Sequence, residues 1–226
     1  LVHNRFGVLG SFSQFTPAVK DSSWVDTVKH EAWVQLEPSP ITYRRNRKFK
    51  QCRLFYGYNT VPCDAQLFIN GKLSWFDTFS PEQRLQMEHW TFDTVPQSLK
   101  FQFSGTDSPE FYGFTLDGLA GVAVDNVALR GSSGLIFRKM DLNMLKSFLE
   151  ILNVKMLIMQ FGGNVVPHIV EDYSYYKRWF YSQLATLKRI KPDLTIIVIG
   201  VADMSQKEKG YYVSYPNIEK IRDAMK

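Results

Sequence analysis

Residues 154–164 read VKMLIMQFGGN, a near-continuous apolar run that ends in two glycines and an asparagine. Strands covered on both faces of a parallel sheet have this composition, so we expect Val154–Phe161 to be a strand buried on both faces. Leu194–Gly200 (LTIIVIG) predicts a second strand of the same kind. Apolar residues at helical spacing predict a helix over Tyr175–Ile190, between the two strands. A strand, a helix and a strand in this order indicate a right-handed parallel α/β unit.

Further elements extend this pattern on both sides. Gly121–Leu129 (GVAVDNVAL) has the composition of a strand. Asp141 is placed to cap a helix over Leu142–Leu152, because its carboxylate can accept hydrogen bonds from the first free backbone N–H groups. A last helix is expected over Asn217–Lys226. Together these elements predict part of an α/β domain in the second half of the chain.

The first half has a different pattern, with short strands separated by turn residues and no long amphipathic helix. Asn70-Gly71 lies between two such strands and is a strong signal for a two-residue hairpin. Many short strands at this spacing predict an all-β sandwich. The expected strands are Ala32–Leu36, Gln51–Tyr58, Ala65–Ile69, Lys72–Phe76, Met87–Phe92, Ser98–Phe103 and Phe111–Thr115.

The net charge of +5 arises mainly in Tyr43–Lys50 (YRRNRKFK), which contains Arg44, Arg45, Arg47, Lys48 and Lys50. Such a run suits a phosphate backbone or an acidic glycan, but it is also typical of a solvated edge strand. No nucleic-acid-binding motif accompanies it, so we expect a solvated edge and no nucleic-acid partner. The longest apolar run, Leu194–Ala202, is far shorter than the roughly 18 residues of a membrane helix, so no membrane span is expected.

Cys52 and Cys63 are the only two cysteines. They flank a turn-rich segment between two predicted strands, a placement that allows either a cross-strand disulfide or two buried thiols. The four histidines are scattered and show no metal-ligand spacing, so neither a metal nor another cofactor is expected. The chain starts at LVHNRFG without Met and stops within a predicted helix, so we expect both ends to be internal to a longer polypeptide.

Two loops that follow predicted strands carry residue types that acyl transfer requires. Gly131 lies in LRGSSG after Gly121–Leu129, where no side chain obstructs its backbone N–H, and Asn164 follows Val154–Phe161 with a side-chain amide. Carboxyl ends of parallel strands meet at one edge of a sheet, so we expect the two donors to lie close together. Two converging donors stabilise the oxyanion of acyl transfer, although each motif taken alone also fits a plain turn.

The order of these motifs resembles that of the SGNH/GDSL esterases. Phe111–Gly134 (FYGFTLDGLAGVAVDNVALRGSSG) is similar to the entry into the second signature block of that family, and Phe161–Asn164 (FGGN) is similar to the third. The resemblance covers residues 110–226. It is strongest to the subset with an inserted β-sandwich similar to a carbohydrate-binding module, as in peptidoglycan O-acetylesterases. It implies an α+β chain with an all-β sandwich over residues 1–113 and part of a flavodoxin-like α/β domain over residues 114–226.

The resemblance also implies an activity and a set of site residues. A serine would attack an acyl ester on a glycan, the Gly131 N–H and the Asn164 amide would hold the oxyanion, and Ser132 would contact substrate. The family's Gly-Asp-Ser and Asp-x-x-His blocks are not in this sequence, and we expect Gly105–Ser108 (GTDS) to be a loop. The chain is therefore expected to be an internal fragment that is inactive alone. Many relatives carry an Asp where this chain has Val165, which leaves the support of Asn164 open.

Two alternatives stand beside this interpretation. A complete site within the chain would pair Ser132 or Ser133 with His168, although R-G-S-S-G lacks the flanking glycines of a nucleophile elbow. The other alternative is a non-catalytic glycan-binding or structural module with a degenerate hydrolase half. In the sandwich, Trp75 is the tryptophan we expect to be exposed and to stack on a sugar ring of the substrate. From the resemblance alone, we expect an extracytoplasmic location, periplasmic or secreted.

Overall fold

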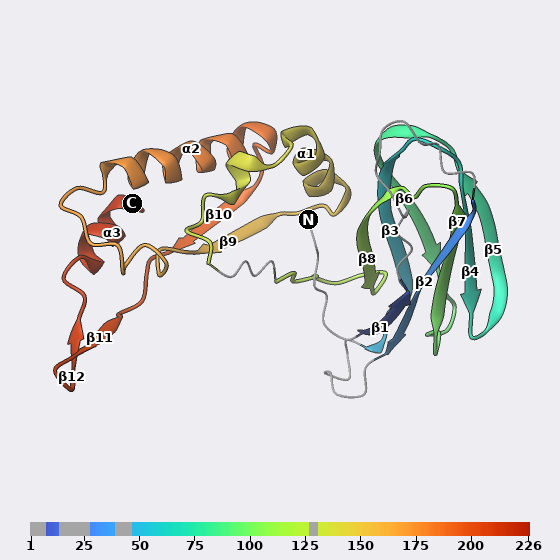
Figure 1. The fold of residues 1–226 in the computed structure, drawn as a ribbon, viewed down its shortest axis with the longest axis horizontal. Helices are drawn as coiled ribbons and strands as arrows, with labels where there is room; N and C mark the ends of the chain where they lie inside the picture. The colour runs from blue at the N-terminus through green and yellow to red at the C-terminus, as the bar shows by residue number, and fades with distance from the viewer. Residues whose placement is uncertain (1–7, 14–27, 39–46, 127–130) are drawn as a thin grey trace. The chain divides into compact units, whose positions relative to one another are not determined.

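The computed structural model describes residues 8–13, 28–38, 47–126 and 131–226. They form two compact units, Leu1–Val127 and Ala128–Lys226. The first unit contains antiparallel β-sheets, and the second contains helices and a small parallel sheet (Figure 1). Arg44 and Arg45 of the cationic segment lie outside the described residues.

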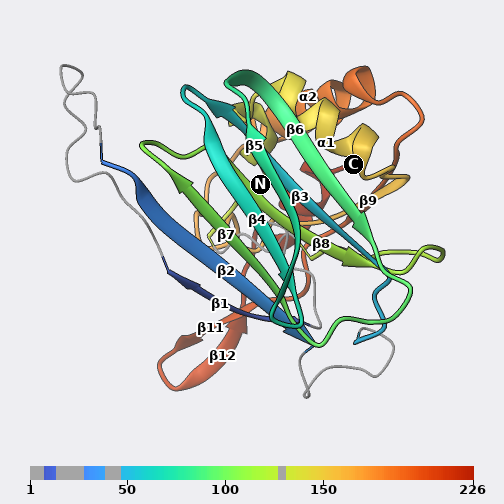
Figure 2. The same cartoon turned by 90° about the vertical axis from the view of Figure 1, so that its right-hand side faces the viewer.

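The first unit is a sandwich of a five-stranded and a three-stranded sheet, with strand orders β1-β2-β7-β4-β5 and β6-β3-β8 (Figure 2). The strands are β1 (Val8–Ser13), β2 (His30–Pro38), β3 (Gln51–Asn59), β4 (Cys63–Ile69), β5 (Lys72–Phe79), β6 (Glu82–Thr91), β7 (Leu99–Gly105) and β8 (Glu110–Asp117). All seven predicted strands are present, with ends that differ by a few residues. The predicted β-sandwich is therefore confirmed, and β1 is a strand that the sequence pattern did not reveal.

Alternation along the strands produces the sandwich core. In β7, Leu99, Phe101 and Phe103 are buried, and the residues between them are only partly buried. Successive strand side chains point to opposite faces, so this pattern places one face of β7 against the second sheet. Leu54 of β3 and Leu67 of β4 are fully buried in the same core.

The Asn70-Gly71 hairpin is present between β4 and β5. Both residues have positive φ, +51° at Asn70 and +80° at Gly71, as the tight hairpin turn requires. The Asn70 side-chain oxygen also accepts hydrogen bonds from the backbone N–H groups of Gln97 and Ser98, at 2.8 and 3.1 Å. The turn is therefore joined to the segment that leads into β7.

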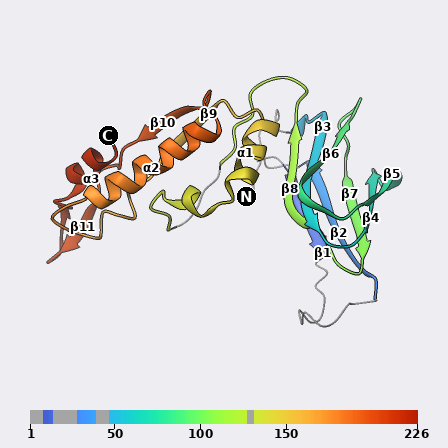
Figure 3. The same cartoon turned by 90° about the horizontal axis from the view of Figure 1, so that it is seen from above.

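The second unit is a partial α/β unit. Its elements are the 3₁₀ helix η2 (Ile136–Lys139), α1 (Leu142–Ile151), β9 (Met156–Gln160), α2 (Ser174–Ile190), β10 (Thr195–Ile199), β11 (Ser205–Glu208), β12 (Tyr211–Ser214) and α3 (Ile218–Ala224). β9 and β10 pair in parallel, and α2 connects them and runs along the pair (Figures 1 and 3). The predicted cap is confirmed, because the Asp141 carboxylate accepts hydrogen bonds from Asn143 N and Met144 N at 2.8 and 2.9 Å.

The expectation that both parallel strands are buried on two faces is wrong. Met159 of β9 is buried, but Ile158 beside it is 58% exposed, and Ile197 opposite it on β10 is 41% exposed. One face of the pair packs toward α2, while the other carries apolar side chains that the described residues leave uncovered. A continuous apolar run does not distinguish these two arrangements, because both faces are apolar in sequence.

The predicted strand Gly121–Leu129 is also wrong over its described part. Residues 121–126 contain only an isolated bridge residue, Asn126, and residues 127–129 lie outside the described residues. A strand exists only with a hydrogen-bonding partner, and none of the described sheets includes this segment. Its apolar composition alone therefore did not produce a strand.

The second unit also contains a hairpin that was not predicted, formed by β11 and β12. Its turn residues Lys209 and Gly210 both have positive φ, and its tyrosines Tyr211 and Tyr212 are exposed.

None of the described helices combines the length and apolar character needed to cross a lipid bilayer.

Candidate active site

The loop of residues 131–134 has a backbone that favours glycine at two positions. Gly131 has φ +79° and Gly134 has φ +89°. A Cβ on Gly134 would lie 2.6 Å from the ring of Phe161, so that glycine allows the loop to approach the end of β9. A Cβ on Gly131 would meet open space, so the loop is accessible at that residue.

Three side chains hold the loop by its carbonyl groups. The Asn164 amide donates to Ser132 O at 2.8 Å, and the Tyr176 hydroxyl donates to Ser133 O at 2.8 Å. The Gln183 amide donates to Gly134 O. Three consecutive carbonyls are thus fixed by donors from the β9 loop and from α2, which restricts the conformations available to the peptide groups between them.

Unlike the carbonyls of the loop, its N–H groups are not all hydrogen-bonded to described residues. Gly134 N donates to the Ser132 hydroxyl at 3.1 Å. No described residue accepts a hydrogen bond from the N–H of Gly131 or Ser133. The loop therefore presents two backbone donors that no described residue uses.

Asn164 is set by a turn at the carboxyl end of β9. Gly162 has φ +100°, and its carbonyl accepts hydrogen bonds from Val165 N at 2.8 Å and Val166 N at 3.3 Å. A Cβ on Gly162 would lie 3.1 Å from the sulfur of Met225, the residue that follows α3. A larger residue at position 162 would therefore press against the end of α3. The Asn164 side chain is exposed, and its NH₂ has a second hydrogen beyond the one donated to Ser132 O.

The turn after Asn164 is supported by a buried asparagine. Asn217 donates to Val166 O at 2.9 Å and to the Tyr173 hydroxyl at 2.5 Å. That hydroxyl donates in turn to His168 O at 2.7 Å. Val165, the residue directly after Asn164, is buried and has no side-chain polar group that could support it. Support for this loop therefore comes from Asn217 and Tyr173.

The structure brings the predicted residues Gly131, Ser132 and Asn164 to one place, through the contact between Asn164 and Ser132. Their roles in an oxyanion hole and in substrate contact stay predictions. The structure does not assemble the alternative site, because within the described residues no hydrogen bond joins the His168 ring to Ser132 or Ser133. His168 is exposed, and its hydrogen bonds are made by its backbone, from its N–H to Val165 O and from the Tyr173 hydroxyl to its carbonyl.

Tyr176 and Gln183 were not predicted as site residues. Both are buried on the face of α2 that also buries Phe180 and Leu187. The sequence signal for Gln183 was its position among the apolar residues of α2. A buried amide needs hydrogen-bond partners, so a glutamine at such a position indicates a polar contact. Burial raises the pKa of Tyr176 to about 12, so its hydroxyl stays protonated and donates to Ser133 O at neutral pH.

The two cysteines, the other candidate nucleophiles, are not activated for catalysis. Cys52 and Cys63 are buried, unbridged thiols, which decides between the two alternatives for this pair. Burial raises the pKa of Cys52 strongly and that of Cys63 to about 11, so neither forms a thiolate at neutral pH. Gly105 is the last residue of β7, and Thr106–Ser108 form the loop that was expected for Gly105–Ser108. In this loop the Asp107 carboxylate accepts a hydrogen bond from Ser108 N at 2.8 Å. The described residues contain no cluster suited to a metal ion.

Trp75 was expected to be exposed, and this expectation is wrong. It is half-buried, packs against the sandwich core and meets Trp90 edge-on at 5.1 Å between ring centroids. The bulge in β4–β5 pairing between Leu67 and Phe68 lies next to it. The exposed aromatic residue of β5 is instead its neighbour Phe76, on the opposite face of the strand.

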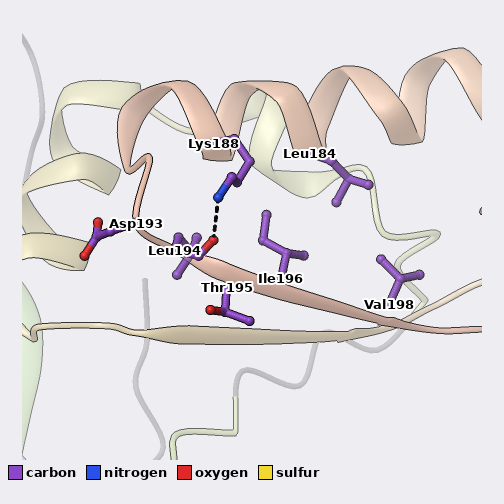
Figure 4. A pocket seen from close by; sticks show the side chains of 7 residues that line it. All are labelled: Leu184, Lys188, Asp193, Leu194, Thr195, Ile196 and Val198. Atoms are coloured by element: carbon purple, nitrogen blue, oxygen red, sulfur yellow. Dashed lines mark hydrogen bonds between the residues drawn. The ribbon is translucent and has the colours of Figure 1, made fainter.

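A cavity of about 460 Å³ lies elsewhere in the second unit, between α2 and β10 (Figure 4). Its lining residues are Leu184, Lys188, Asp193, Leu194, Thr195, Ile196 and Val198. The Lys188 ammonium donates to Leu194 O at 3.1 Å, as the dashed line shows. The lining includes neither Asn164 nor a residue of the 131–134 loop, so this cavity is distinct from the candidate site.

These units together define a class of architecture, a β-sandwich joined to part of an α/β domain. No family model and no curated protein matches the sequence. Among solved structures, the chain is similar to a peptidoglycan O-acetylesterase, with a TM-score of 0.62 and 10% identity over 98% of this chain. The chain spans 61% of the length of that enzyme. At this identity the likeness is one of fold.

Two family 2 carbohydrate esterases also align with the chain at 10% identity. The enzyme from Clostridium thermocellum, solved with cellohexaose, gives a TM-score of 0.26 over 96% of this chain and 82% of its own. The enzyme from Cellvibrio japonicus gives 0.23 over 84% and 79%. Scores this low do not establish a shared fold.

Proposed function

We propose that the chain is part of a serine ester hydrolase of the SGNH/GDSL type that removes acyl groups from a glycan. The observation that supports this most directly is the hydrogen bond from the Asn164 amide to Ser132 O, which joins Asn164 to the loop that contains Gly131. The proposal includes a flavodoxin-like α/β domain over residues 114–226, a sandwich over residues 1–113 and an extracytoplasmic location.

The mechanism needs groups from outside this sequence. A serine would attack the ester carbonyl, and a histidine oriented by an aspartate would take the serine proton. As the carbonyl carbon becomes tetrahedral, its oxygen gains negative charge. The Gly131 N–H and the second hydrogen of the Asn164 amide would donate to that oxygen, with no large rearrangement because the loop carbonyls are already fixed.

The test uses the longest polypeptide that the gene encodes. Release of acetate from O-acetylated glycans and of nitrophenol from p-nitrophenyl acetate is measured for the unmodified protein and for Asn164→Ala. Loss of one oxyanion donor should lower kcat by about 10²–10³-fold with little change in KM. Asn143→Ala, an exposed asparagine on α1, is the matched control and should retain full activity.

Two outcomes would contradict the proposal. Equal activity of Asn164→Ala and the control would exclude Asn164 from the oxyanion hole. No esterase activity in any form of the protein would leave a non-catalytic glycan-binding or structural module. The 226-residue chain itself should be inactive, and turnover abolished by Ser132→Ala or Ser133→Ala would instead favour a site contained within it.

A further inference from the structure

The outer face of the five-stranded sheet carries a row of two amides between two aromatic rings. Trp33 of β2 is opposite Gln102 of β7, Gln102 is opposite Gln66 of β4, and Gln66 is opposite Phe76 of β5. This sheet is the one with β2, β7, β4 and β5 side by side in Figure 2. At about 4.8 Å per strand, the two aromatic residues are roughly 14 Å apart along the row. The Phe76 side chain is 56% exposed, so its ring is accessible to a ligand. The Trp33 ring is already contacted by the Lys100 ammonium, which lies 5.2 Å from the ring centroid.

The neighbouring row on the same face contains hydroxyls and carboxylates. Glu31 is opposite Ser104, Ser104 is opposite Asp64, and Asp64 is opposite Thr78. The Thr78 hydroxyl donates to Asp64 at 2.9 Å, and this bond is the main reason that the pKa of Asp64 lies below its ordinary value. Asp64 is therefore ionised at neutral pH and acts as a hydrogen-bond acceptor.

The two rows enclose a shallow cavity of about 150 Å³. It is lined by Glu31, Asp64, Gln66, Phe76, Gln102 and Ser104. The Gln102 amide of the first row donates to Glu31 of the second row at 3.3 Å, so this hydrogen bond joins the two rows and orients the amide. Six side chains from four strands thus combine donors, acceptors and one open aromatic ring in one depression.

This combination matches the chemistry of a saccharide. Each sugar hydroxyl both donates and accepts a hydrogen bond, as does each glutamine amide, and a carboxylate accepts from two hydroxyls at once. The C–H face of a sugar ring is apolar and packs on an aromatic ring with exclusion of water. The cavity is lined by two carboxyl side chains, Glu31 and Asp64, and by no cation, while the Lys29 ammonium pairs with Asp64 at 3.2 Å. The lining therefore offers a polyanion no cationic partner of its own.

We propose that this face binds a neutral glycan chain, with Phe76 as the stacking residue and Gln66, Gln102, Glu31 and Asp64 as hydrogen-bonding residues. This site lies on the first unit and uses none of the residues of the candidate active site. It goes beyond the proposed function, because a glycan-binding face is independent of whether Asn164 takes part in ester hydrolysis.

The experiment measures binding to the 226-residue chain by isothermal titration calorimetry. The probes are chitohexaose and cellohexaose as neutral glycans and hexagalacturonate as an acidic one. At least one neutral probe should bind, and Phe76→Ala and Gln102→Ala should each weaken its binding by about tenfold, the loss expected for one stacking contact or one bidentate amide. Hexagalacturonate should not bind.

Two matched controls separate this face from general effects. Tyr212→Ala removes an exposed aromatic ring on the β11–β12 hairpin, and Gln35→Ala removes an amide of the same sheet that does not line the cavity. Both should bind within twofold of the unmodified chain, and so should Asn164→Ala, which tests hydrolysis and not binding. Circular dichroism verifies that each variant is folded.

Absence of binding to all three probes would overturn the proposal. So would binding of a neutral probe that Phe76→Ala and Gln102→Ala leave unchanged, or binding restricted to hexagalacturonate. If Asn164→Ala leaves hydrolysis by the longest polypeptide unchanged while Phe76→Ala weakens glycan binding, only the proposed function fails. If Asn164→Ala abolishes hydrolysis while no probe binds the chain, only the glycan-binding face fails.

Discussion

The two units of this chain bury their apolar side chains to different degrees. In the sandwich, both sheets turn an apolar face inward, and residues such as Leu54 and Phe101 are almost completely buried. In the α/β unit, the β9–β10 pair packs one face toward α2 and leaves Ile158 and Ile197 on the other face exposed. The sandwich thus has a closed core, whereas the core of the α/β unit is one-sided.

This difference indicates which interactions stabilise each unit and fix its loops. Removal of apolar surface from water stabilises the sandwich from within. In the α/β unit, buried polar side chains such as Gln183, Tyr176 and Asn217 hold loops through individual hydrogen bonds. Such bonds are directional, so they fix the geometry of the 131–134 loop while contributing less free energy than a large core.

The largest expected effect is a break of the sandwich core. Phe101→Ala removes a ring that is 1% exposed and lies 4.6 Å from the Phe114 ring and 5.2 Å from the Trp90 ring between centroids. The free energy of unfolding of the sandwich should fall by about 3–5 kcal/mol. Urea denaturation followed by tryptophan fluorescence measures this loss. Ile158→Ala, on the exposed face of β9, should change stability by less than about 0.5 kcal/mol, and equal effects would refute the contrast between the two cores.

An intermediate effect is expected from Gln183→Leu in the α/β unit. The leucine cannot replace the bonds to Gly134 O and from Phe137 N, so a buried carbonyl and a part-buried N–H lose their partner. We expect a loss of about 2 kcal/mol, followed by circular dichroism at the helix band, since the described helices all lie in this unit.

Ser182→Leu places the same residue one position earlier on the exposed side of α2 and serves as the control. It should be nearly neutral. If Gln183→Leu is neutral as well, the loop does not depend on that side chain for its order.

The smallest effect concerns the charge on the outer face of the sandwich. Thr78→Val removes the main cause of the lowered pKa of Asp64, so that pKa should rise toward its ordinary value of 3.8. A lowered pKa contributes stability above the unfolded-state value, and this contribution is lost as the pH falls through the folded-state value. Carbon-13 NMR titration of the Asp64 carboxyl group should show a higher midpoint in the variant. An unchanged midpoint would assign the shift to Lys29, whose ammonium lies 3.2 Å from the carboxylate.

Local patterns were enough to predict most of the fold. Alternation in the first half located seven strands, Asn70-Gly71 located a hairpin, and Asp141 located the start of α1. The exposed face of β9 and the missing strand at residues 121–126 were not predictable in this way. Both depend on which segments pack beside them, and composition contains no information on neighbours.

The candidate site shows the same limit. Asn164 and the glycine loop were predicted from their positions after strands, and the structure joins them by the bond from Asn164 to Ser132 O. The anchoring role of Tyr176 depends on a loop 43 residues earlier in the chain, so no local pattern indicates it. Trp75 and Phe76 are adjacent in sequence, and only the strand pairing decides which of the two faces outward.

The strand order of the sandwich also has a consequence for its synthesis. β2 pairs with β7, from His30 opposite Gly105 to Leu36 opposite Leu99, and β3 pairs with β8. Pairings between segments so distant in sequence form slowly, because a long loop must close before any contact is gained. On the ribosome, neither sheet can be completed before its last strand, β7 or β8, has left the exit tunnel. The nascent first half therefore exposes its apolar strands throughout that interval, and such unpaired strands are prone to aggregate.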